Sequence, residues 1–424
     1  MTVVQRERAA LVGLFNDSPR HFDPEHALDE LAGLASAAGA DAVLRVQQER
    51  ARPDPATFLG KGKVAMLAAA SSEARVDTVI FDNELSPAQL RNLEGALDRK
   101  VVDRTQLILD IFARRARTRE GKLQVELAQL QYLMPRLVGS SDALSRQGGG
   151  IGTLGPGETK LETDRRRIRH RISILSKEID TVRRRRSQLR ERRHKSAVPT
   201  VALVGYTNAG KTTLFNFLTG GDAAASNALF VTLDPLVRRV KLPDRRDLLV
   251  SDTVGFIDRL PHSLVAAFRA TLEEVAEADL LLHVIDAAAP DRDRRIAAVN
   301  TVLAEVGATR VPSVDIFNKS DQLSAAERAR LAALYPGALC VSALTGEGRD
   351  EVIAAMETRL ALDTVTVTFE FDPQDERDRD QISQLYRFGR ILRHVASDSS
   401  ITVEAELPKR LLERFQRADV RARA

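Results

Sequence analysis

The most informative segment of this chain is Gly205-Tyr-Thr-Asn-Ala-Gly-Lys-Thr212. It fits the pattern G-x-x-x-x-G-K-[ST], it follows the apolar run Thr200–Val204, and it precedes the helical pattern Leu214–Leu218. In this strand–loop–helix context the glycines let the backbone fold around phosphate oxygens, with N–H groups at a helix N-terminus. Lys211 is then placed to reach the β- and γ-phosphates, and Thr212 to hold Mg²⁺. The segment therefore predicts a nucleoside triphosphate site.

A second segment, Asp252-Thr-Val-Gly255, follows the strand pattern Leu248–Ser251. Asp252 is placed there to hold Mg²⁺ through a water molecule. The Gly255 N–H is placed to contact the γ-phosphate. The pattern D-x-x-G alone is weak evidence for a nucleotide site. Its position at the end of a strand, after the phosphate loop, makes that evidence stronger.

A third segment, Asn318-Lys-Ser-Asp321, follows the strand pattern Val311–Phe317 and indicates which base is bound. An Asp at this point accepts two hydrogen bonds from the guanine N1–H and 2-amino groups. Adenine offers neither group, and a site built on polar pairing rejects such an analogue strongly. Ser342-Ala-Leu344, after the last predicted strand, would place backbone N–H groups at guanine O6.

These four segments, in this order, resemble the GTPase domain of the P-loop superfamily. By that resemblance Thr232, within Phe230-Val-Thr-Leu-Asp-Pro235, is the switch residue that closes on Mg²⁺ and the γ-phosphate. Phe256 stands where Ras-like enzymes have a water-orienting Gln. Because a phenyl ring cannot polarise water, we expect slow intrinsic hydrolysis or a contribution from a residue elsewhere. Asn208 resembles the Asn of GTPases that use K⁺ in place of an arginine finger, and the alternative is a local backbone cap.

The residues expected to act are Lys211, Thr232 and Gly255 in catalysis, with Thr212, Thr232 and Asp252 holding Mg²⁺. The residues expected to contact GTP or GDP are Gly205, Tyr206, Thr207, Asn208, Ala209, Gly210, Lys211, Thr212, Thr213, Phe230, Val231, Thr232, Asp252, Thr253, Val254, Gly255, Asn318, Lys319, Asp321, Ser342, Ala343 and Leu344.

Composition narrows the class of protein. The chain has 424 residues with a net charge of only +4. The single cysteine, Cys340, excludes a disulfide framework, a cysteine-based zinc site and an iron–sulfur cluster. No stretch approaches 18 apolar residues, so no membrane-spanning helix is expected. The N-terminus has no apolar signal region, and we expect a cytoplasmic protein.

Basic charge is concentrated in residues 158–195, which hold 15 Lys and Arg against 6 Asp and Glu. Within this segment Leu161, Ile168, Ile172, Leu175, Ile179, Val182 and Leu189 follow a heptad frame. A first heptad seam comprises Leu123, Leu127, Leu130, Met134 and Leu137, and seven glycines among residues 139–157 separate the two. The pattern predicts an antiparallel helical hairpin with a glycine-rich loop, its second helix spanning Glu158–His194.

The remaining patterns predict an α/β multidomain fold. Residues 1–115 read as an N-terminal α/β domain, and 116–197 as the hairpin. Residues 198–362 read as a Ras-like P-loop GTPase domain with a mixed sheet and flanking helices, in which His283 is expected to be a core residue. Residues 363–424 read as a small α+β domain with a strand at Thr364–Phe371, an acidic linker at Asp372–Asp380, a helix at Ile382–Val395 and a strand at Ile401–Ala405.

The part before the GTPase domain resembles one family closely. The segments that carry the resemblance are Phe58-Leu-Gly-Lys-Gly-Lys-Val64, Val102-Asp-Arg-Thr-Gln-Leu-Ile-Leu-Asp-Ile-Phe-Ala113, Gly121-Lys-Leu-Gln-Val-Glu-Leu-Ala-Gln-Leu130 and the glycine-rich block Gly148–Arg166. Over about residues 1–362 the chain is similar to the HflX family of GTPases. The resemblance implies docking on the large ribosomal subunit and its rRNA, and nucleotide-dependent splitting or rescue of stalled ribosomes under stress.

Three functions stay open at this point. The first is a ribosome-stimulated GTPase, expected to be a monomer, whose basic helix contacts the phosphate backbone of rRNA. The second is an ATP- or GTP-dependent RNA remodeller. The third is a non-catalytic RNA-binding adaptor in which the nucleotide only sets the conformation. This alternative stays open because Phe256 stands in place of a water-orienting Gln.

Overall fold

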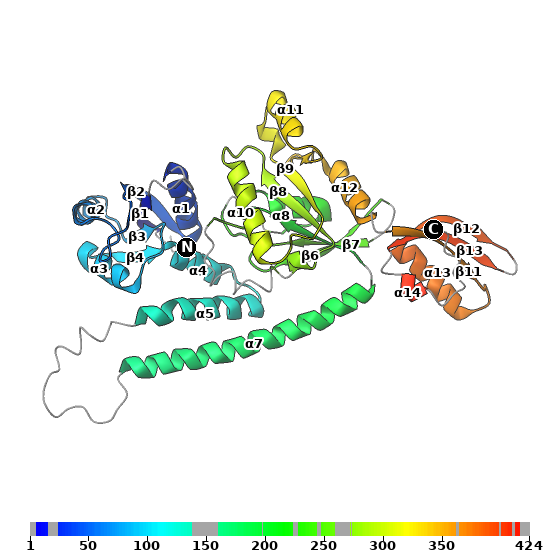
Figure 1. The fold of residues 1–424 in the computed structure, drawn as a ribbon, viewed down its shortest axis with the longest axis horizontal. Coiled ribbons are helices and arrows are strands. Elements are labelled where there is room, and N and C mark those ends of the chain that lie inside the picture. The colour runs from blue at the N-terminus through cyan, green and yellow to red at the C-terminus, as the bar shows by residue number, and fades with distance from the viewer. Residues whose placement is uncertain are drawn as a thin grey trace, which may run out of the picture. The chain divides into compact units, whose positions relative to one another are not determined.

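The computed structural model describes residues 6–15, 24–137, 160–196, 198–223, 228–243, 247–258, 272, 274–361, 364–397, 400–408 and 412–415. Figure 1 shows helices and strands in alternation along most of the chain. The described residues form two compact units. The first unit comprises residues up to 182 together with 228–233, and the second comprises residues 183–223, 234–258 and those from 272 onward.

The first unit contains a four-stranded sheet in the order β2-β1-β3-β4. All its strand pairs are parallel, whereas the alternation of strands and helices in the sequence predicts only a partly parallel sheet. Its strands are β1 (Glu7–Phe15), β2 (Ala40–Glu49), β3 (Thr78–Phe81) and β4 (Lys100–Asp103), and its helices are α1 (Pro24–Ala38), α2 (Lys61–Glu73), α3 (Pro87–Leu97) and α4 (Arg104–Arg115).

Local sequence explains where these elements begin. Ser86 caps α3 because its side chain accepts from the Gln89 N–H while the Gln89 side chain accepts from the Ser86 N–H. Asp103 caps α4 in a similar way, since its carboxylate accepts from the Gln106 N–H. The short strand β3 is buried along its whole length, which is typical of a parallel strand covered on both faces.

The hairpin predicted from the two heptad seams is present. Helix α5 (Arg119–Leu133) continues as the 3-10 turn η1 (Met134–Leu137), and α7 (Lys160–Ser196) lies beside α5 in Figure 1. Arg119 pairs with Glu178 and Arg171 pairs with Glu126, which fixes an antiparallel register. Leu123, Leu175 and Ile179 are buried at the centre of the seam, with Leu127 and Leu130 against them.

The first seam is shorter than expected. Met134 and Leu137 lie in η1 rather than in the α-helix, because Pro135 has no N–H to donate to the helical ladder. The glycine-rich loop predicted at residues 139–157 lies outside the described residues. So do the side chains of residue 183 and residues 185–196 in α7.

The second unit contains a six-stranded sheet in the order β10-β9-β8-β5-β7-β6. Its strands are β5 (Thr200–Val204), β6 (Leu236–Lys241), β7 (Asp247–Asp252), β8 (Leu280–Asp286), β9 (Ser313–Asn318) and β10 (Leu339–Cys340). Its helices are α8 (Lys211–Thr219), α10 (Arg292–Glu305), η2 (Ser320–Gln322), α11 (Ala325–Leu334) and α12 (Arg349–Ala361). Only β6 runs antiparallel to its neighbour, which confirms the mixed sheet expected for the GTPase domain.

A three-stranded antiparallel sheet, in the order β11-β13-β12, ends the second unit. It comprises β11 (Thr364–Phe371), β12 (Arg390–Ala396) and β13 (Ile401–Pro408), with α13 (Glu376–Phe388) and α14 (Leu412–Phe415). Val367, Phe369 and Phe371 pack from β11 into its core.

Two expectations for this region are wrong. The acidic stretch Asp372–Asp380 is not a linker, because α13 begins within it and the Asp375 side chain caps the helix at the Arg377 N–H. The predicted helix Ile382–Val395 ends instead at Phe388. A Cβ atom at Gly389 would lie 3.1 Å from the Glu406 carbonyl oxygen, which is a tight approach, and the following residues pair with β13 as strand β12. The four domain boundaries drawn from the sequence stay predictions.

Candidate nucleotide-binding site

The phosphate loop joins β5 to α8, as the sequence predicts. Gly210 ends the loop with φ 92°, a conformation that residues other than glycine rarely adopt. A Cβ atom at Gly210 would also collide with the side-chain amide of Asn318. Glycine is therefore required there by both backbone conformation and space, and the N-terminal N–H groups of α8 are left facing the loop.

Lys211 lies buried at the start of α8. Its Nζ donates to the Gly205 carbonyl at 3.0 Å and to the Tyr206 carbonyl at 2.8 Å. Burial lowers the pKa of Lys211 to about 8, and the negative charge of Asp252 opposes that shift. A phosphate group beside Nζ would replace two neutral acceptors with a charged one, so this ammonium is suited to an anionic ligand.

Thr212 and Asp252 meet although they come from different elements. The pairing of Leu203 with Asp252 between β5 and β7 brings the end of β7 beside the phosphate loop. There Thr212 Oγ1 donates to Asp252 Oδ2 at 2.8 Å. A hydroxyl and a carboxylate oxygen are the donors that Mg²⁺ takes from a protein when phosphate oxygens and water complete its shell. The pair fits the metal role predicted for it.

Asn318 connects the base motif with the phosphate loop. Its buried side chain donates from Nδ2 to the Ala209 carbonyl at 2.9 Å and accepts at Oδ1 from the Ala343 N–H at 3.0 Å. The position of Asn318 at the end of β9 sets this geometry, because β9 lies two strands from β5 in the parallel sheet. Sequence reasoning assigned Asn318 to the nucleotide and missed its role as a brace between the two motifs.

Asp321 and Ser342 also lie together, as the order of the motifs predicts. Ser342 Oγ donates to Asp321 Oδ1 at 2.6 Å, which leaves Oδ2 for a further donor. The ammonium of Lys319 pairs with the Asp286 carboxylate at 2.6 Å. Leu344, by contrast, is 80% exposed, so its predicted contact rests on its backbone.

The segment after β7, which we call the strap (residues 253–258), lies against the phosphate loop. The Phe256 N–H donates to the Gly205 carbonyl at 3.1 Å, and the Thr207 N–H donates to the Phe256 carbonyl at 2.8 Å. A Cβ atom at Gly255 would lie 2.8 Å from Thr207 Cγ2, so only glycine allows this approach. The ring of Phe256 is buried, and it has no polar group that could orient a water molecule.

The candidate switch residues fall in the first unit. Residues 228–233 group with the N-terminal sheet and helices. Phe230, which has φ 55° and is 2% exposed, sets its ring 4.7 Å from that of Phe112 in α4 at an angle of 78°. The side chain of Phe230 is therefore part of the packing of this unit. The metal role of Thr232 stays a prediction.

His283 is buried in β8, as expected of a core residue. Its Nδ1 lies 3.0 Å from Asp315 Oδ1 on the neighbouring strand β9, and this pair accounts for an acidic residue in an otherwise apolar strand.

A polar cluster in the first unit, unlike the nucleotide motifs, gave no sequence signal. Arg136 in η1 reaches the Asp103 carboxylate at 3.1 Å and the Leu85 carbonyl at 3.0 Å, with its guanidinium 3.4 Å from the centroid of the Tyr132 ring. Burial, followed by the charge of Asp103, raises the pKa of Tyr132. The cluster holds the end of the first hairpin helix on the edge of the N-terminal sheet.

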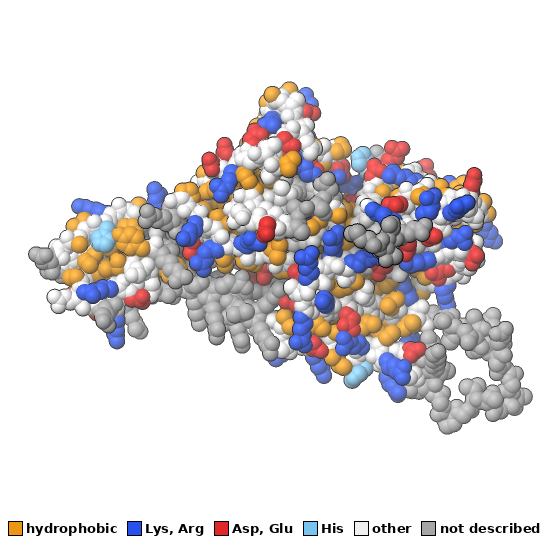
Figure 2. All heavy atoms as spheres, turned by 180° about the vertical axis from the view of Figure 1, so that it is seen from behind, with side chains coloured by type: hydrophobic (Ala, Val, Ile, Leu, Met, Phe, Trp, Pro, Cys, Tyr) orange, Lys and Arg blue, Asp and Glu red, His pale blue; other side chains and the backbone are white. Residues whose placement is uncertain are grey.

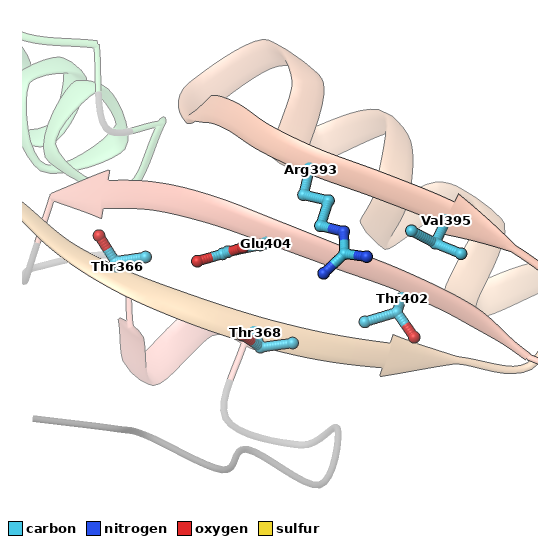
Figure 3. A pocket seen from close by; sticks show the side chains of 6 residues that line it. All are labelled: Thr366, Thr368, Arg393, Val395, Thr402 and Glu404. Carbon is cyan, nitrogen blue, oxygen red and sulfur yellow. The ribbon is translucent and has the colours of Figure 1, made fainter.

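A cavity of about 450 Å³ lies on the C-terminal sheet. Figure 3 shows Arg393 extending from β12 toward the central strand β13, with Thr366 and Thr368 on β11. Its lining is polar and contains none of the predicted nucleotide residues. On the face seen in Figure 2, basic and acidic side chains are interspersed.

A phosphate loop after a parallel strand, the Thr212–Asp252 pair and the Asn318–Asp321 base motif together define a P-loop GTPase. Three family models match this chain. They are described as GTP-binding GTPase N-terminal over residues 25–113, GTP-binding GTPase Middle Region over residues 115–193, and 50S ribosome-binding GTPase over residues 200–319.

Curated relatives named GTPase HflX match almost the whole chain. That of Caldanaerobacter subterraneus subsp. tengcongensis is 45% identical over 97% of this chain and 93% of its own length. The relative from Escherichia coli K12 is 45% identical over 95% of this chain and 94% of its own length. The chain belongs to the GTPase HflX family. It is a GTPase, and its nucleotides are GTP and GDP.

Solved structures also align with the chain. A GTP-binding protein from Sulfolobus solfataricus in complex with GDP matches with a TM-score of 0.45 and 23% identity, over 84% of this chain and 98% of that one. Among the described residues, no helix has the length and apolar character needed to span a bilayer.

Proposed function

We propose that this protein is a cytoplasmic, monomeric GTPase that binds the large ribosomal subunit, is stimulated by it, and splits or rescues stalled ribosomes under stress. The observation that carries the proposal is the match of residues 200–319 to the 50S ribosome-binding GTPase model. In the same chain a hairpin carries the most basic segment, 15 Lys and Arg against 6 Asp and Glu in residues 158–195. We also propose that the chain is divided into four domains, which span residues 1–115, 116–197, 198–362 and 363–424.

The site residues have distinct roles in this proposal. The phosphate-loop N–H groups and Lys211 bind the β- and γ-phosphates, the Gly255 N–H contacts the γ-phosphate, and Asp321 selects guanine. Thr212 and Asp252, joined by Thr232, would hold Mg²⁺, which would neutralise charge on the phosphates. Water attacks the γ-phosphate in line, and the side chains contribute by positioning and by stabilising charge. We assign K⁺ coordination to Asn208, which has φ 60° within the phosphate loop.

The hairpin provides the proposed contact with rRNA. Helix α7 contains three arginines within four residues, Arg166, Arg167 and Arg169. Arg167 is largely exposed although it pairs with Asp164. Exposed arginines along a helix suit the phosphate backbone of RNA, whose binding releases counterions and weakens with salt. The antiparallel packing of α5 on α7 holds this helix at a fixed position in the first unit.

GTP hydrolysis with and without purified large subunits, in K⁺ and in Na⁺ buffer, tests the proposal. We expect a large stimulation by the subunit, and a preference for K⁺ that is lost in Asn208→Ala. An unstimulated rate would contradict ribosome activation while leaving the GTPase assignment in place. Splitting is followed separately, as the conversion of 70S particles to subunits by light scattering. A variant with Lys211→Ala serves as the control for nucleotide dependence.

A further inference from the structure

The strap is held on the phosphate loop from its far end as well as by its own backbone. Asp258, the last residue of the strap, donates its N–H to Tyr206 Oη at 3.0 Å. Its carboxylate pairs with the guanidinium of Arg294 in α10. Arg295, next on α10, sets its guanidinium 5.2 Å from the centroid of the Tyr206 ring. Asp258 is therefore fixed to α10 and to the phosphate loop at once.

This arrangement engages groups that phosphate would otherwise use. The Thr207 N–H, one of the loop donors, is occupied by the Phe256 carbonyl at 2.8 Å. The Thr207 hydroxyl is buried and has no hydrogen-bond partner among the described residues. Lys211 donates to two loop carbonyls, those of Gly205 and Tyr206. Because a donor cannot serve the Phe256 carbonyl and a phosphate oxygen equally well, nucleotide binding must compete with the strap.

The competition concerns the γ-phosphate more than the β-phosphate. Gly255, whose N–H is assigned to the γ-phosphate, lies within the strap, and a Cβ atom on it would be 3.1 Å from Lys211 Nζ. A diphosphate needs the loop donors around the β-phosphate and makes no demand on Gly255. A triphosphate needs Gly255 and Thr207 to rearrange about its terminal group. Any contact that fixes the strap therefore changes the affinity for GTP relative to the affinity for GDP.

We propose that Arg294, acting through Asp258 and assisted by the Tyr206 hydroxyl, is a positioning residue that sets the preference of this GTPase between GTP and GDP. The ion pair holds the strap on the phosphate loop and so disfavours the triphosphate state. A partner that draws Arg294 or Asp258 away releases the strap. This inference rests on the phosphate-loop assignment and not on the ribosome.

Nucleotide affinities of the full-length protein test the role of Arg294. Dissociation constants for GDP and for a GTP analogue with a non-hydrolysable β–γ imido bridge are measured by competition with a fluorescent GDP, without ribosomes. For Arg294→Ala and for Asp258→Asn we expect the ratio of analogue affinity to GDP affinity to rise about two- to fivefold, the usual value of one partly exposed ion pair. Arg294→Lys keeps the charge and should stay near the wild-type ratio.

The control removes a matched ion pair elsewhere in the same unit. Arg239 pairs with Asp247 at 3.1 Å, and that aspartate is 14% exposed against 13% for Asp258. Arg239→Ala should leave the ratio unchanged, and the double exchange Arg294→Asp with Asp258→Arg should return it toward wild type. An unchanged ratio in Arg294→Ala and Asp258→Asn, or an equal rise in Arg239→Ala, would overturn the proposal. Loss of GDP binding in Lys211→Ala, measured alongside, separates a failure of the strap from a failure of the site.

Discussion

Thr212 Oγ1 donates to Asp252 Oδ2 at 2.8 Å across 40 residues of sequence. The hydrogen bond unites the phosphate loop with the end of β7 and creates the oxygen pair assigned to Mg²⁺. Thr212→Ala should weaken the affinity for Mg²⁺·GDP on the order of 10- to 100-fold, since it removes one donor of the pair. Isothermal titration of Mg²⁺ into the GDP complex measures the loss. Thr219→Ala, at the other end of α8, should retain wild-type affinity, and equal losses in both variants would refute the metal assignment.

Lys211 gives nucleotide binding a characteristic pH dependence. Its pKa is about 8 in the nucleotide-free protein, and bound phosphate favours the charged form. Below pH 8 the ammonium is already charged, so affinity for GDP should be nearly constant. Above pH 8 binding must take up a proton, and affinity should fall toward tenfold per pH unit. Titration calorimetry at pH 7 and 9 in buffers of different ionisation enthalpy counts that proton. In Lys211→Arg the uptake should vanish, and an uptake that persists would contradict the role of Lys211.

Asp321 should determine the base. Asp321→Asn keeps an oxygen for the Ser342 hydroxyl, which lies 2.6 Å from Oδ1, so the local fold should survive. The amide repels the guanine N1–H while matching xanthine, and GTP affinity should fall by about a hundredfold or more as xanthosine triphosphate begins to bind. Competition between the two nucleotides provides the measurement. Undiminished GTP affinity would remove Asp321 from the base site.

Phe230 and Phe112 should be energetically coupled. Each ring is buried, and their edge-to-face geometry at 4.7 Å is of the kind that contributes about 0.5–1.5 kcal/mol beyond area burial. A double-mutant cycle with Phe230→Ala and Phe112→Ala, followed by thermal unfolding, should give a coupling of about 1 kcal/mol. Hydrogen exchange should rise in α4 of Phe230→Ala. Strictly additive effects would show that the two rings do not stabilise each other.

The basic helix should govern the salt dependence of ribosome binding. Replacing Arg183–Arg186 with Ala should weaken co-sedimentation with large subunits and flatten the dependence of log affinity on log salt by about one per lost contact. The matched control replaces Arg377, Arg379, Arg390 and Arg393 in the C-terminal region, which removes the same charge. If both sets reduce binding equally, net charge rather than the helix is responsible.

Local signals in the sequence were enough for the phosphate loop and the hairpin. Thr200–Val204 forms the strand, and Leu214–Leu218 lies in the helix, that their patterns predict, because apolar periodicity acts within a few residues. Strand β6 (Leu236–Lys241) was not predicted, since it is an exposed edge strand whose pairing with β7 is what orders it. The misplaced helix end near Gly389 has a similar origin, in contacts with β13 that a local pattern does not contain.

The candidate site likewise contains residues that local motifs predict and residues that only tertiary packing brings together. Apart from Thr232, which the resemblance to GTPases supplies, every residue that touches a phosphate or a base in the proposal stands within a motif and could be found by its spacing. Asp258 and Arg294 could not, because their pairing depends on how α10 packs beside the phosphate loop. The burial of Phe230 in the first unit likewise depends on Phe112, 118 residues earlier in the numbering, and no local pattern predicts it.

Asn318 has a consequence for how nucleotide affinity is composed. One side-chain amide holds the Ala209 carbonyl of the phosphate loop and the Ala343 N–H beside the base. Ordering either half of the site therefore orders part of the other, and the conformational entropy of that step is lost only once. Guanosine and pyrophosphate presented as separate molecules would each bear that entropy alone, so their free energies of binding would not sum to that of GDP. The binding free energy of GDP therefore cannot be divided into a base contribution and a phosphate contribution, because the Asn318 side chain couples the two halves of the site.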